Sequence, residues 1–379
     1  MAAQVSAQVG AKPRLGILAS QYFGWGTYGG FGSMSRRLAE GLKAAGREVC
    51  VIVPRRRGQQ ASETIGGVPV HSFDARNLGE AIRLMRAAPV DIFHSQDPTV
   101  LTYLAQRVRP ECVHLVTSRD PHDGRDWWTE FRYATNRRRL LMPFHYLTES
   151  GPLVSRAVRA AQAVFCPAQC LRPKVQRLFG LRALPGFLPN LIDVPPTVAP
   201  KAARPTFVYV ARFDKRKRPW LFFELARQFP DYRFVAVGQG SASAERGYDE
   251  RLRRQYQGLP NLQLTGLINR FSEPERMSAV LSEAWALVST GAREGLPLTF
   301  LEAAAHGCAI VSQVDADGMA TRFGEWAADG DFGQALRRLM RGAPLEKGLQ
   351  ARDYVLAQHE SSRALAAHLE VYQGFAGAG

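Results

Sequence analysis

Short apolar runs alternate with stretches of helical periodicity along most of the chain. Apolar runs with little polar alternation predict strands that are buried on both faces, as in a parallel sheet covered by helices. In the first half, these strands are expected at residues 15–19, 49–53, 90–93, 112–117 and 163–166. The helices between them are expected at residues 31–45, 78–87, 99–108 and 171–178.

Residues 189–205 interrupt this alternation. The stretch contains five prolines and no helical period, which is typical of a linker. Beyond it, strands are expected at residues 207–210, 234–237, 262–265, 284–289 and 309–312. Further helices are expected at residues 220–228, 242–256, 273–281, 298–306, 332–340 and 345–359.

This pattern predicts an α/β protein of two doubly wound, Rossmann-like domains with parallel sheets. A length of 379 residues is enough for two domains, and the linker separates residues 1–193 from residues 194–360. Open sheets of this kind bind ligands at the carboxyl ends of their strands. We therefore expect the functional site in a cleft between the two domains.

The composition fits a folded protein of the cytoplasm. With 22% charged and 46% hydrophobic residues the chain is not of the disordered class, and no apolar run reaches the roughly 18 residues of a spanning helix. The N-terminus has no signal-peptide pattern, and five cysteines agree with a reducing compartment. Cys166 and Cys170 form a C-x3-C pair without a second pair, so we expect buried small side chains and no zinc site.

The net charge of +15 lies mostly on the first half. Residues 1–193 contain 26 Lys and Arg against 14 Asp and Glu, a net charge of +12, whereas residues 194–379 contain 23 against 20, a net charge of +3. A basic half points to an anionic partner, which can be nucleic acid, anionic lipid or a phosphorylated substrate.

Glycines follow the first predicted strand. Gly29, Gly30 and Gly32 come before a predicted helix, where glycine lets the backbone approach a ligand and free N–H groups attract an anion. The spacing is neither the G-x-G-x-x-G of a dinucleotide site nor that of a P-loop. The glycines alone therefore identify no particular ligand.

Two segments of the second half carry more specific chemistry. Arg212 and Lys217 follow the first strand there, and two fixed cations at a strand end suit a pyrophosphate. Glu294 and Glu302 stand eight residues apart, the first in a loop and the second on the following helix. A carboxylate accepts two hydroxyl hydrogen bonds, the geometry of a sugar or ribose diol. The free N–H groups at Leu298 and Thr299 are expected to face the cleft.

These segments together resemble one enzyme family. E-G-x-P-x4-E at residues 294–302 is similar to the E-x7-E signature of retaining glycosyltransferases with the GT-B fold, family 4 (glycosyltransferase group 1). A-R-F-D-K-R-K resembles the R-x4-K motif of the family, and G-G-x-G at residues 29–32 resembles its opening glycine loop. P-N-L-I-D at residues 189–193 and N-L-Q-L-T-G at residues 261–266 agree in order and position.

The resemblance implies a function and a set of donor-side roles. The chain would transfer a sugar from a nucleotide-sugar donor to a glycan or lipid-linked acceptor, with retention and without a metal or other cofactor. The motifs contain no convincing nucleophilic carboxylate for a covalent route, so we expect a same-face displacement that the leaving phosphate assists. The D-x-D at residues 315–317 is assigned to a loop. The second domain would bind the donor and the first the acceptor, with a last helix at residues 361–379 packed back on the first. The donor residues would be Arg212 and Lys217 on the diphosphate, Glu302 on the ribose, Glu294 with Gly295, Leu296, Leu298 and Thr299 near the sugar, and Gly29, Gly30 and Gly32 facing the diphosphate.

The first domain departs from the family at one position. The family carries His in a T-x-H-D segment, and Arg119 occupies that position in Thr117-Ser118-Arg119-Asp120. Three explanations are open: Arg119 takes the role of the family histidine, His122 reaches into the site instead, or the acceptor chemistry differs. A role for His122 as an ordinary surface-loop residue is equally open. His94 and Asp97 follow another strand. In one interpretation they contact the acceptor together with Asp120; in the other they belong to a turn in which Asp97 caps the next helix.

Two arginine runs give the first half much of its charge. They are Arg55–Arg57 and Arg137–Arg139, and the second lies among Trp127, Trp128, Phe131, Tyr133 and Phe144. This mixture suits an anionic membrane, with the protein peripheral at the inner face, and it equally suits a helix whose aromatic side chains face the core. No nucleic-acid motif is present, so a nucleic-acid partner is not expected. A binding protein on an inactive enzyme scaffold is the main alternative to the enzyme.

Overall fold

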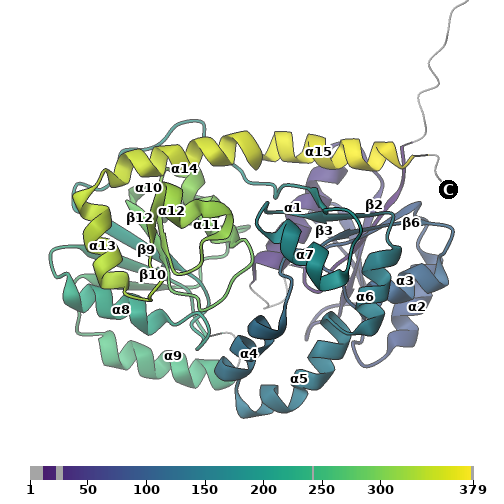
Figure 1. The fold of residues 1–379 in the computed structure, drawn as a ribbon, viewed down its shortest axis with the longest axis horizontal. Coiled ribbons are helices and arrows are strands. Elements are labelled where there is room, and N and C mark those ends of the chain that lie inside the picture. The colour runs from purple at the N-terminus through teal and green to yellow at the C-terminus, as the bar shows by residue number, and fades with distance from the viewer. Residues whose placement is uncertain (1–11, 23–28, 241–242, 377–379) are drawn as a thin grey trace, which may run out of the picture.

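The computed structural model describes residues 12–22, 29–240 and 243–376, which form two α/β domains side by side (Figure 1). The N-terminal domain has an eight-stranded sheet of order β3-β4-β2-β1-β5-β6-β7-β8, parallel except for the β3–β4 pair. Its strands are β1 (Leu15–Leu18), β2 (Val49–Pro54), β3 (Ser62–Ile65), β4 (Val68–Phe73), β5 (Ile92–Ser95), β6 (Val113–Thr117), β7 (Ala163–Cys166) and β8 (Gly186–Phe187). The antiparallel hairpin and β8 are absent from the sequence prediction, because β3 is an exposed edge strand and β8 has two residues.

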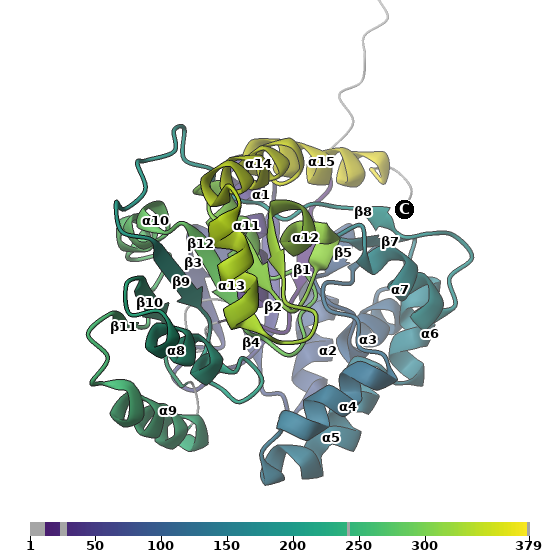
Figure 2. The ribbon, with the colours of Figure 1, turned by 60° about the vertical axis from the view of Figure 1, so that its left-hand side comes forward.

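Helices cover this sheet, and their apolar spacing explains why they form. In α1 the buried side chains Met34, Leu38 and Leu42 recur every four residues and therefore share one face. Three helices lie between β6 and β7; α4 and α5 extend away from the sheet (Figure 2), whereas α6 packs on it beside α3. The helices are α1 (Gly30–Ala44), α2 (Leu78–Ala87), α3 (Val100–Val108), α4 (Gly124–Tyr133), α5 (Asn136–Glu149), α6 (Pro152–Ala160) and α7 (Leu171–Phe179).

The C-terminal domain repeats the doubly wound order in a six-stranded parallel sheet, β11-β10-β9-β12-β13-β14. Its strands are β9 (Thr206–Val210), β10 (Arg233–Val237), β11 (Leu262–Gly266), β12 (Ala286–Ser289), β13 (Ala309–Ser312) and β14 (Gly324–Trp326). Its helices are α8 (Pro219–Gln228), α9 (Ser243–Tyr256), α10 (Pro274–Glu283), α11 (Leu298–Ala305), the short η1 (Ala316–Gly318), α12 (Met319–Phe323), α13 (Phe332–Arg341) and α14 (Pro344–Gln358).

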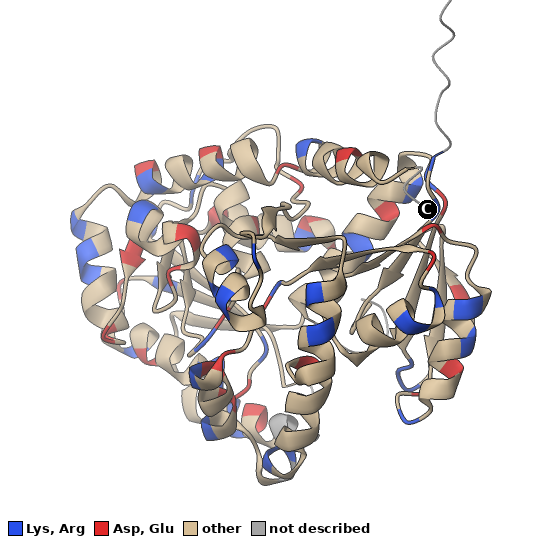
Figure 3. Ribbon diagram, turned by 45° about the vertical axis from the view of Figure 1, so that its right-hand side comes forward, with Lys and Arg blue, Asp and Glu red and all other residues tan. Residues whose placement is uncertain are grey.

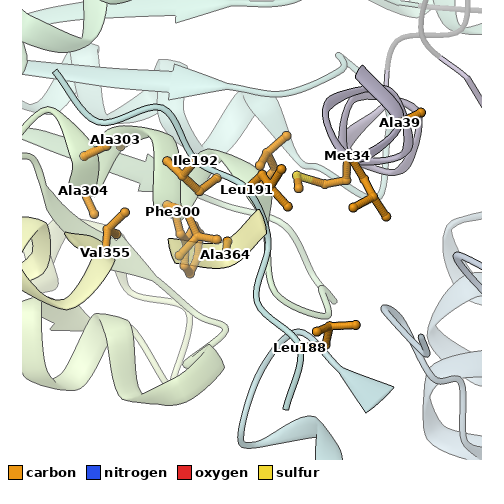
Figure 4. Packing of buried hydrophobic residues seen from close by; sticks show 14 of the residues in the cluster. Met34, Ala39, Leu188, Leu191, Ile192, Phe300, Ala303, Ala304, Val355 and Ala364 are labelled. Atoms are coloured by element: carbon orange, nitrogen blue, oxygen red, sulfur yellow. The ribbon is translucent and has the colours of Figure 1, made fainter. Parts of the chain in front are cut away.

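A long helical segment joins the two domains on one side. Helix α14 packs on α11, and α15 (Ser361–Gly374) continues from it across the N-terminal domain, where it contacts α1 (Figure 1). The linker between the domains is also part of this junction, because the backbone of Ile192 forms an isolated parallel β-bridge with Glu360. Buried side chains from both domains and from the linker make one continuous apolar cluster here (Figure 4).

Two features outside the cleft have structural roles. The carboxylate of Asp317 accepts hydrogen bonds from the backbone N of Gln169 (3.0 Å) and Cys170 (2.7 Å) in the other domain, so the D-x-D segment connects the domains. Cys166 is buried as expected, but Cys170 is exposed, which corrects the expectation for that residue. No described helix is both long and apolar enough to span a bilayer.

Candidate active site between the domains

The strand orders place the site. In each sheet the order reverses beside the first strand, between β1 and β5 and between β9 and β12, and ligands bind at such switch points. The loops that follow these four strands line one cleft of about 1190 Å³ between the domains. This volume exceeds the roughly 300–1,000 Å³ of a typical small-molecule pocket, so the cleft has room for two substrates.

On the C-terminal side of the cleft, Lys217 and Glu294 form an ion pair between Nζ and Oε1. Both line the cleft, and both are largely buried. The loop that carries Lys217 is fixed because Asp214 Oδ1 accepts from the Lys217 backbone N (2.8 Å) and Thr290 Oγ1 donates to the Lys217 carbonyl (2.7 Å). Arg212 also lines the cleft and pairs with Asp214 at 3.3 Å. The structure therefore brings both predicted cations to one wall.

The loop after Glu294 contacts the opposite domain. A Cβ on Gly295 would lie 2.4 Å from the carbonyl oxygen of Arg119, so only glycine fits this approach of backbone to backbone. Gly295, Leu296, Leu298 and Thr299 all line the cleft, and α11 begins at Leu298. Four of the predicted donor residues are thus together where the two domains meet.

Glu302 lies behind this wall. It is 8% exposed and is not among the residues that line the cleft. Its carboxylate instead lies between Arg37 of α1 (3.5 Å) and Arg270 of the loop after β11 (3.4 Å). Neither arginine was singled out from the sequence, and no local motif marks them, because their partner is more than 30 residues away.

The glycine segment is shorter than expected. Helix α1 begins at Gly30, so Gly32 is buried inside the helix and does not line the cleft, which corrects its assignment to the loop. Gly29 and Gly30 do line the cleft, and a Cβ on Gly30 would lie 3.5 Å from Leu298 Cβ of the other domain.

On the N-terminal side, the expectation that His94 contacts the acceptor is wrong. His94 is completely buried beneath the cleft, where Nδ1 bonds to Tyr372 Oη (2.7 Å) and Nε2 to Thr117 Oγ1 (2.8 Å). Asp97 does line the cleft. The alternative that Asp97 caps the next helix is wrong, because the N-cap of α3 is Thr99. Asp97 Oδ1 accepts from the Arg119 backbone N (2.9 Å), and burial raises the pKa of Asp97 to about 7.

Arg119 lines the cleft but turns its guanidinium toward the linker. The guanidinium donates to the side chains of Asn190 and Gln96, and burial lowers the pKa of Arg119 to about 10. No described carboxylate pairs with it within 4 Å. Arg119 therefore connects the cleft to the interdomain linker.

His122, Asp120 and Glu130 belong to a network of charges that crosses the cleft. Arg293 donates to Asp120 Oδ2 (2.9 Å) and Oδ1 (2.6 Å), and Arg216 pairs with Glu130. His122 lies 3.9 Å from Glu130 Oε1, with Nδ1 bonded to the Asp120 carbonyl (2.8 Å). Sequence reasoning missed Arg293 and Arg216, although both stand beside motif residues.

The two arginine runs do not form uniform basic patches. Arg55 pairs with Glu80, Arg56 lines the cleft, and Arg57 is exposed. In the second run, the side chain of Arg137 lies outside the described part, Arg138 lies 3.5 Å from Glu130, and Arg139 donates to two carbonyls of α4. Basic and acidic positions interleave on helices of both domains (Figure 3).

Comparisons with known proteins agree with this architecture. Residues 29–190 match the family model of the glycosyl transferase 4-like domain, and residues 196–330 match that of glycosyl transferases group 1. Among solved structures, the fold is similar to sucrose-phosphate synthase from Thermosynechococcus elongatus, with a TM-score of 0.74 and 17% identity over 97% of this chain and 100% of that one. A search of curated proteins found no match.

Two further structures share the fold at low identity. HepE from Anabaena, in complex with UDP and glucose, has a TM-score of 0.67 and 13% identity, and covers 95% of this chain and 99% of its own. The catalytic domain of starch synthase IV from Arabidopsis thaliana, bound to ADP and acarbose, has a TM-score of 0.64 and 12% identity over 96% and 99%. The fold and the cleft define an enzyme of the GT-B class. The two family models together span both domains, and the chain belongs to the group 1 glycosyltransferases.

Proposed function

We propose that this glycosyltransferase moves a sugar from a nucleotide-sugar donor to a glycan or lipid-linked acceptor, with retention of anomeric configuration and without a metal ion. The observation that carries the proposal is the Lys217–Glu294 ion pair in the cleft, beside Arg212. Breaking a glycosyl–phosphate bond leaves negative charge on the diphosphate. Cations that are already in place stabilise that charge, which is the task that a divalent metal performs in other enzymes.

The proposed route to retention is a same-face displacement. The glycosyl–oxygen bond to the diphosphate breaks, the acceptor oxygen attacks from the same side, and the acceptor proton passes to the leaving phosphate. A double displacement would need a carboxylate about 5 Å from the reacting carbon as nucleophile. Glu294 is paired with Lys217, which suits a binding role better than nucleophilic attack. Trapping of a covalent glycosyl-enzyme would reject the same-face route.

The donor can be tested directly by ligand-induced stabilisation. The relatives in complex with UDP and ADP suggest a panel that begins with UDP-glucose and ADP-glucose. A ligand at about 100 times its Kd adds roughly 2.7 kcal/mol to the free energy of unfolding. Glu302→Ala leaves Arg37 and Arg270 without their counter-charge behind the cleft wall and should reduce the thermal shift, whereas Glu294→Ala should mainly slow transfer. Unchanged binding and turnover in both variants would contradict the site assignment.

One observation favours a second function, a nucleotide-sugar or glycan-binding protein without activity. Arg119 stands where the family carries His, and its guanidinium is already used by Asn190 and Gln96. A pure sample that binds a nucleotide sugar but neither hydrolyses it nor transfers sugar to any acceptor would support this alternative.

We also propose peripheral association with an anionic membrane through the helix pair α4–α5. This pair extends from the N-terminal domain (Figure 2) and exposes Trp128 (65%) and Leu140 (83%) near Arg139. Apolar and aromatic side chains beside cations suit an anionic lipid interface. Flotation with phosphatidylglycerol vesicles should capture the protein, and Trp128→Ser with Leu140→Ser should release it. Equal flotation of the wild type and this variant would reject the proposal.

A further inference from the structure

Arg56 is a cation in the cleft that the donor site does not use. It follows β2, and it lines the cleft from the N-terminal domain. Its guanidinium makes one long hydrogen bond within the described chain, from Nη2 to the Ser20 carbonyl (3.4 Å), and its buried Nε has no partner. Its neighbour Arg55, by contrast, is paired with Glu80. Burying a charge without a counter-charge is costly, which makes an anionic ligand the expected partner of Arg56.

Exposed apolar side chains of two helices line the same cleft. Leu78 at the start of α2 is 41% exposed, and Leu141 and Phe144 of α5 are 47% and 62% exposed, although all three line the cleft. The apolar surface continues along α5 outside the cleft through Leu140 and Leu147. Exposed apolar surface that adjoins a binding cleft indicates an apolar ligand.

We propose that the acceptor is an amphiphile with a phosphate group, which Arg56 binds through its guanidinium, and a hydrocarbon part, which contacts the exposed apolar side chains of Leu78, Leu141 and Phe144. This inference rests on the proposed function and names its acceptor class. The net charge of +12 on residues 1–193 favours an anionic ligand on this side. A guanidinium can form two parallel hydrogen bonds to phosphate oxygens. In Arg56, Nη1 bonds to no described residue and Nη2 makes only the long bond to Ser20, so these two nitrogens are the ones available to a phosphate.

Binding can be measured without knowing the natural acceptor. Isothermal titration calorimetry of the full chain would compare inorganic phosphate, ethyl, butyl, hexyl and octyl phosphate, and a neutral octyl triethylene-glycol ether. Affinity for the alkyl phosphates should rise with chain length, by up to about fourfold per buried methylene. Octyl phosphate should bind tighter than either inorganic phosphate or the neutral ether.

Variants separate the two parts of the ligand. Arg56→Gln should weaken octyl phosphate by about 10- to 100-fold and leave the neutral ether unchanged. Arg57→Gln is the matched control, because Arg57 is the exposed neighbour. Leu141→Gln with Phe144→Gln should remove the dependence on chain length and leave inorganic phosphate unchanged. These side chains are exposed on a helix surface, so the fold should tolerate the change.

Each alternative has its own signature. Equal affinity for inorganic and octyl phosphate would indicate a free sugar phosphate and overturn the amphiphile. Equal losses in Arg56→Gln and Arg57→Gln would overturn the role of Arg56. If Arg56→Gln also weakens nucleotide binding, Arg56 belongs to the donor site and the proposal fails. Failure of the wild type to bind any nucleotide sugar would instead contradict the proposed function, whatever the alkyl phosphates do.

Discussion

Arg293 and Asp120 join the two domains by two hydrogen bonds between one guanidinium and one carboxylate, at 2.9 and 2.6 Å. Arg293 is 6% exposed, and its Nε lies 2.8 Å from Asp126 as well. Although burial alone would raise the pKa of Asp120, the ion pair with Arg293 holds it below the usual value. Because Glu294 is the next residue in the chain, closure of the domains and the position of Glu294 are set together.

We predict that Arg293→Ala lowers kcat by about 100-fold while nucleotide binding stays near that of the wild type. Removing one partner of a buried pair costs about 3–5 kcal/mol, and here the cost falls on the closed arrangement of the domains. Steady-state kinetics and the nucleotide Kd separate the two effects, and small-angle scattering should show a larger radius of gyration. Arg254→Ala, at an exposed pair with Glu250, is the control. A variant that keeps kcat and the compact radius would contradict this role of Arg293.

Gly295 should be intolerant of any side chain. The added Cβ of Gly295→Ala would meet the Arg119 carbonyl at 2.4 Å, and backbone atoms cannot turn aside as a side chain can. We expect the domains to separate and turnover to fall at least about tenfold, with the melting temperature changed little. Gly258→Ala is the matched control, because its Cβ meets nothing within 4 Å. Equal kcat values for the two variants would show that the close approach does not matter for catalysis.

Asp317 should contribute to stability through the contact between the domains. Its carboxylate accepts from the backbone N of Gln169 and Cys170 at the start of α7 and from Tyr354 Oη (3.0 Å). Its φ of 52° favours glycine, asparagine or aspartate, so Asp317→Gly removes the carboxylate without backbone strain. Urea denaturation should show a loss of about 1–2 kcal/mol for Asp317→Gly, and a smaller loss for Asp317→Asn. Equal stability of all three proteins would contradict the prediction.

The sequence predicts the positions of Lys217 and Glu294 on the C-terminal side of the cleft well, because these positions follow from local rules. Lys217 and Glu294 come after β9 and β12, and the carboxyl ends of neighbouring parallel strands meet at one edge. Lys217 and Glu294 are 77 residues apart in the sequence, and the order of the strands is what brings them into contact. The apolar runs also place these strands correctly, since a buried parallel strand has a strong local signal.

The other predicted site residues depend on contacts that no local rule contains. His94 stands at a strand end, as predicted, but Tyr372 of α15 covers it from 278 residues away. Arg293 looks like an ordinary loop residue until Asp120, 173 residues away, comes into contact with it. Glu302 lies behind the wall because Arg37 and Arg270, on separate elements, hold its carboxylate. Contacts of this kind cannot be predicted from the sequence, because they depend on how distant elements pack together.

Buried histidines at the junction with α15 should make the protein less stable in acid. Burial lowers the pKa of His368 to about 3 and that of His359 to about 4, and it also lowers that of His94. At about pH 7.5 and above, these groups are almost entirely neutral in both states and have little effect. Below this pH the unfolded chain binds protons that the folded chain does not, so stability falls as the pH falls toward 4.

The contribution of one histidine can be isolated by substitution. His368 Nε2 bonds to the Pro189 carbonyl (3.1 Å), and the side-chain amide of His368→Gln can replace that donor without titrating. We expect the free energy of unfolding, measured by urea denaturation between pH 7.5 and 4.5, to fall less steeply in the variant. The slopes should differ by up to about 1.4 kcal/mol per pH unit below pH 6, and should converge as the pH rises to 7.5. Asp97, whose pKa is raised to about 7, has the opposite effect: it favours the folded state as the pH falls. Because Asp97 is present in both proteins, its contribution cancels in the comparison. Identical slopes below pH 6 would show that His368 takes up its proton without loss of the folded state.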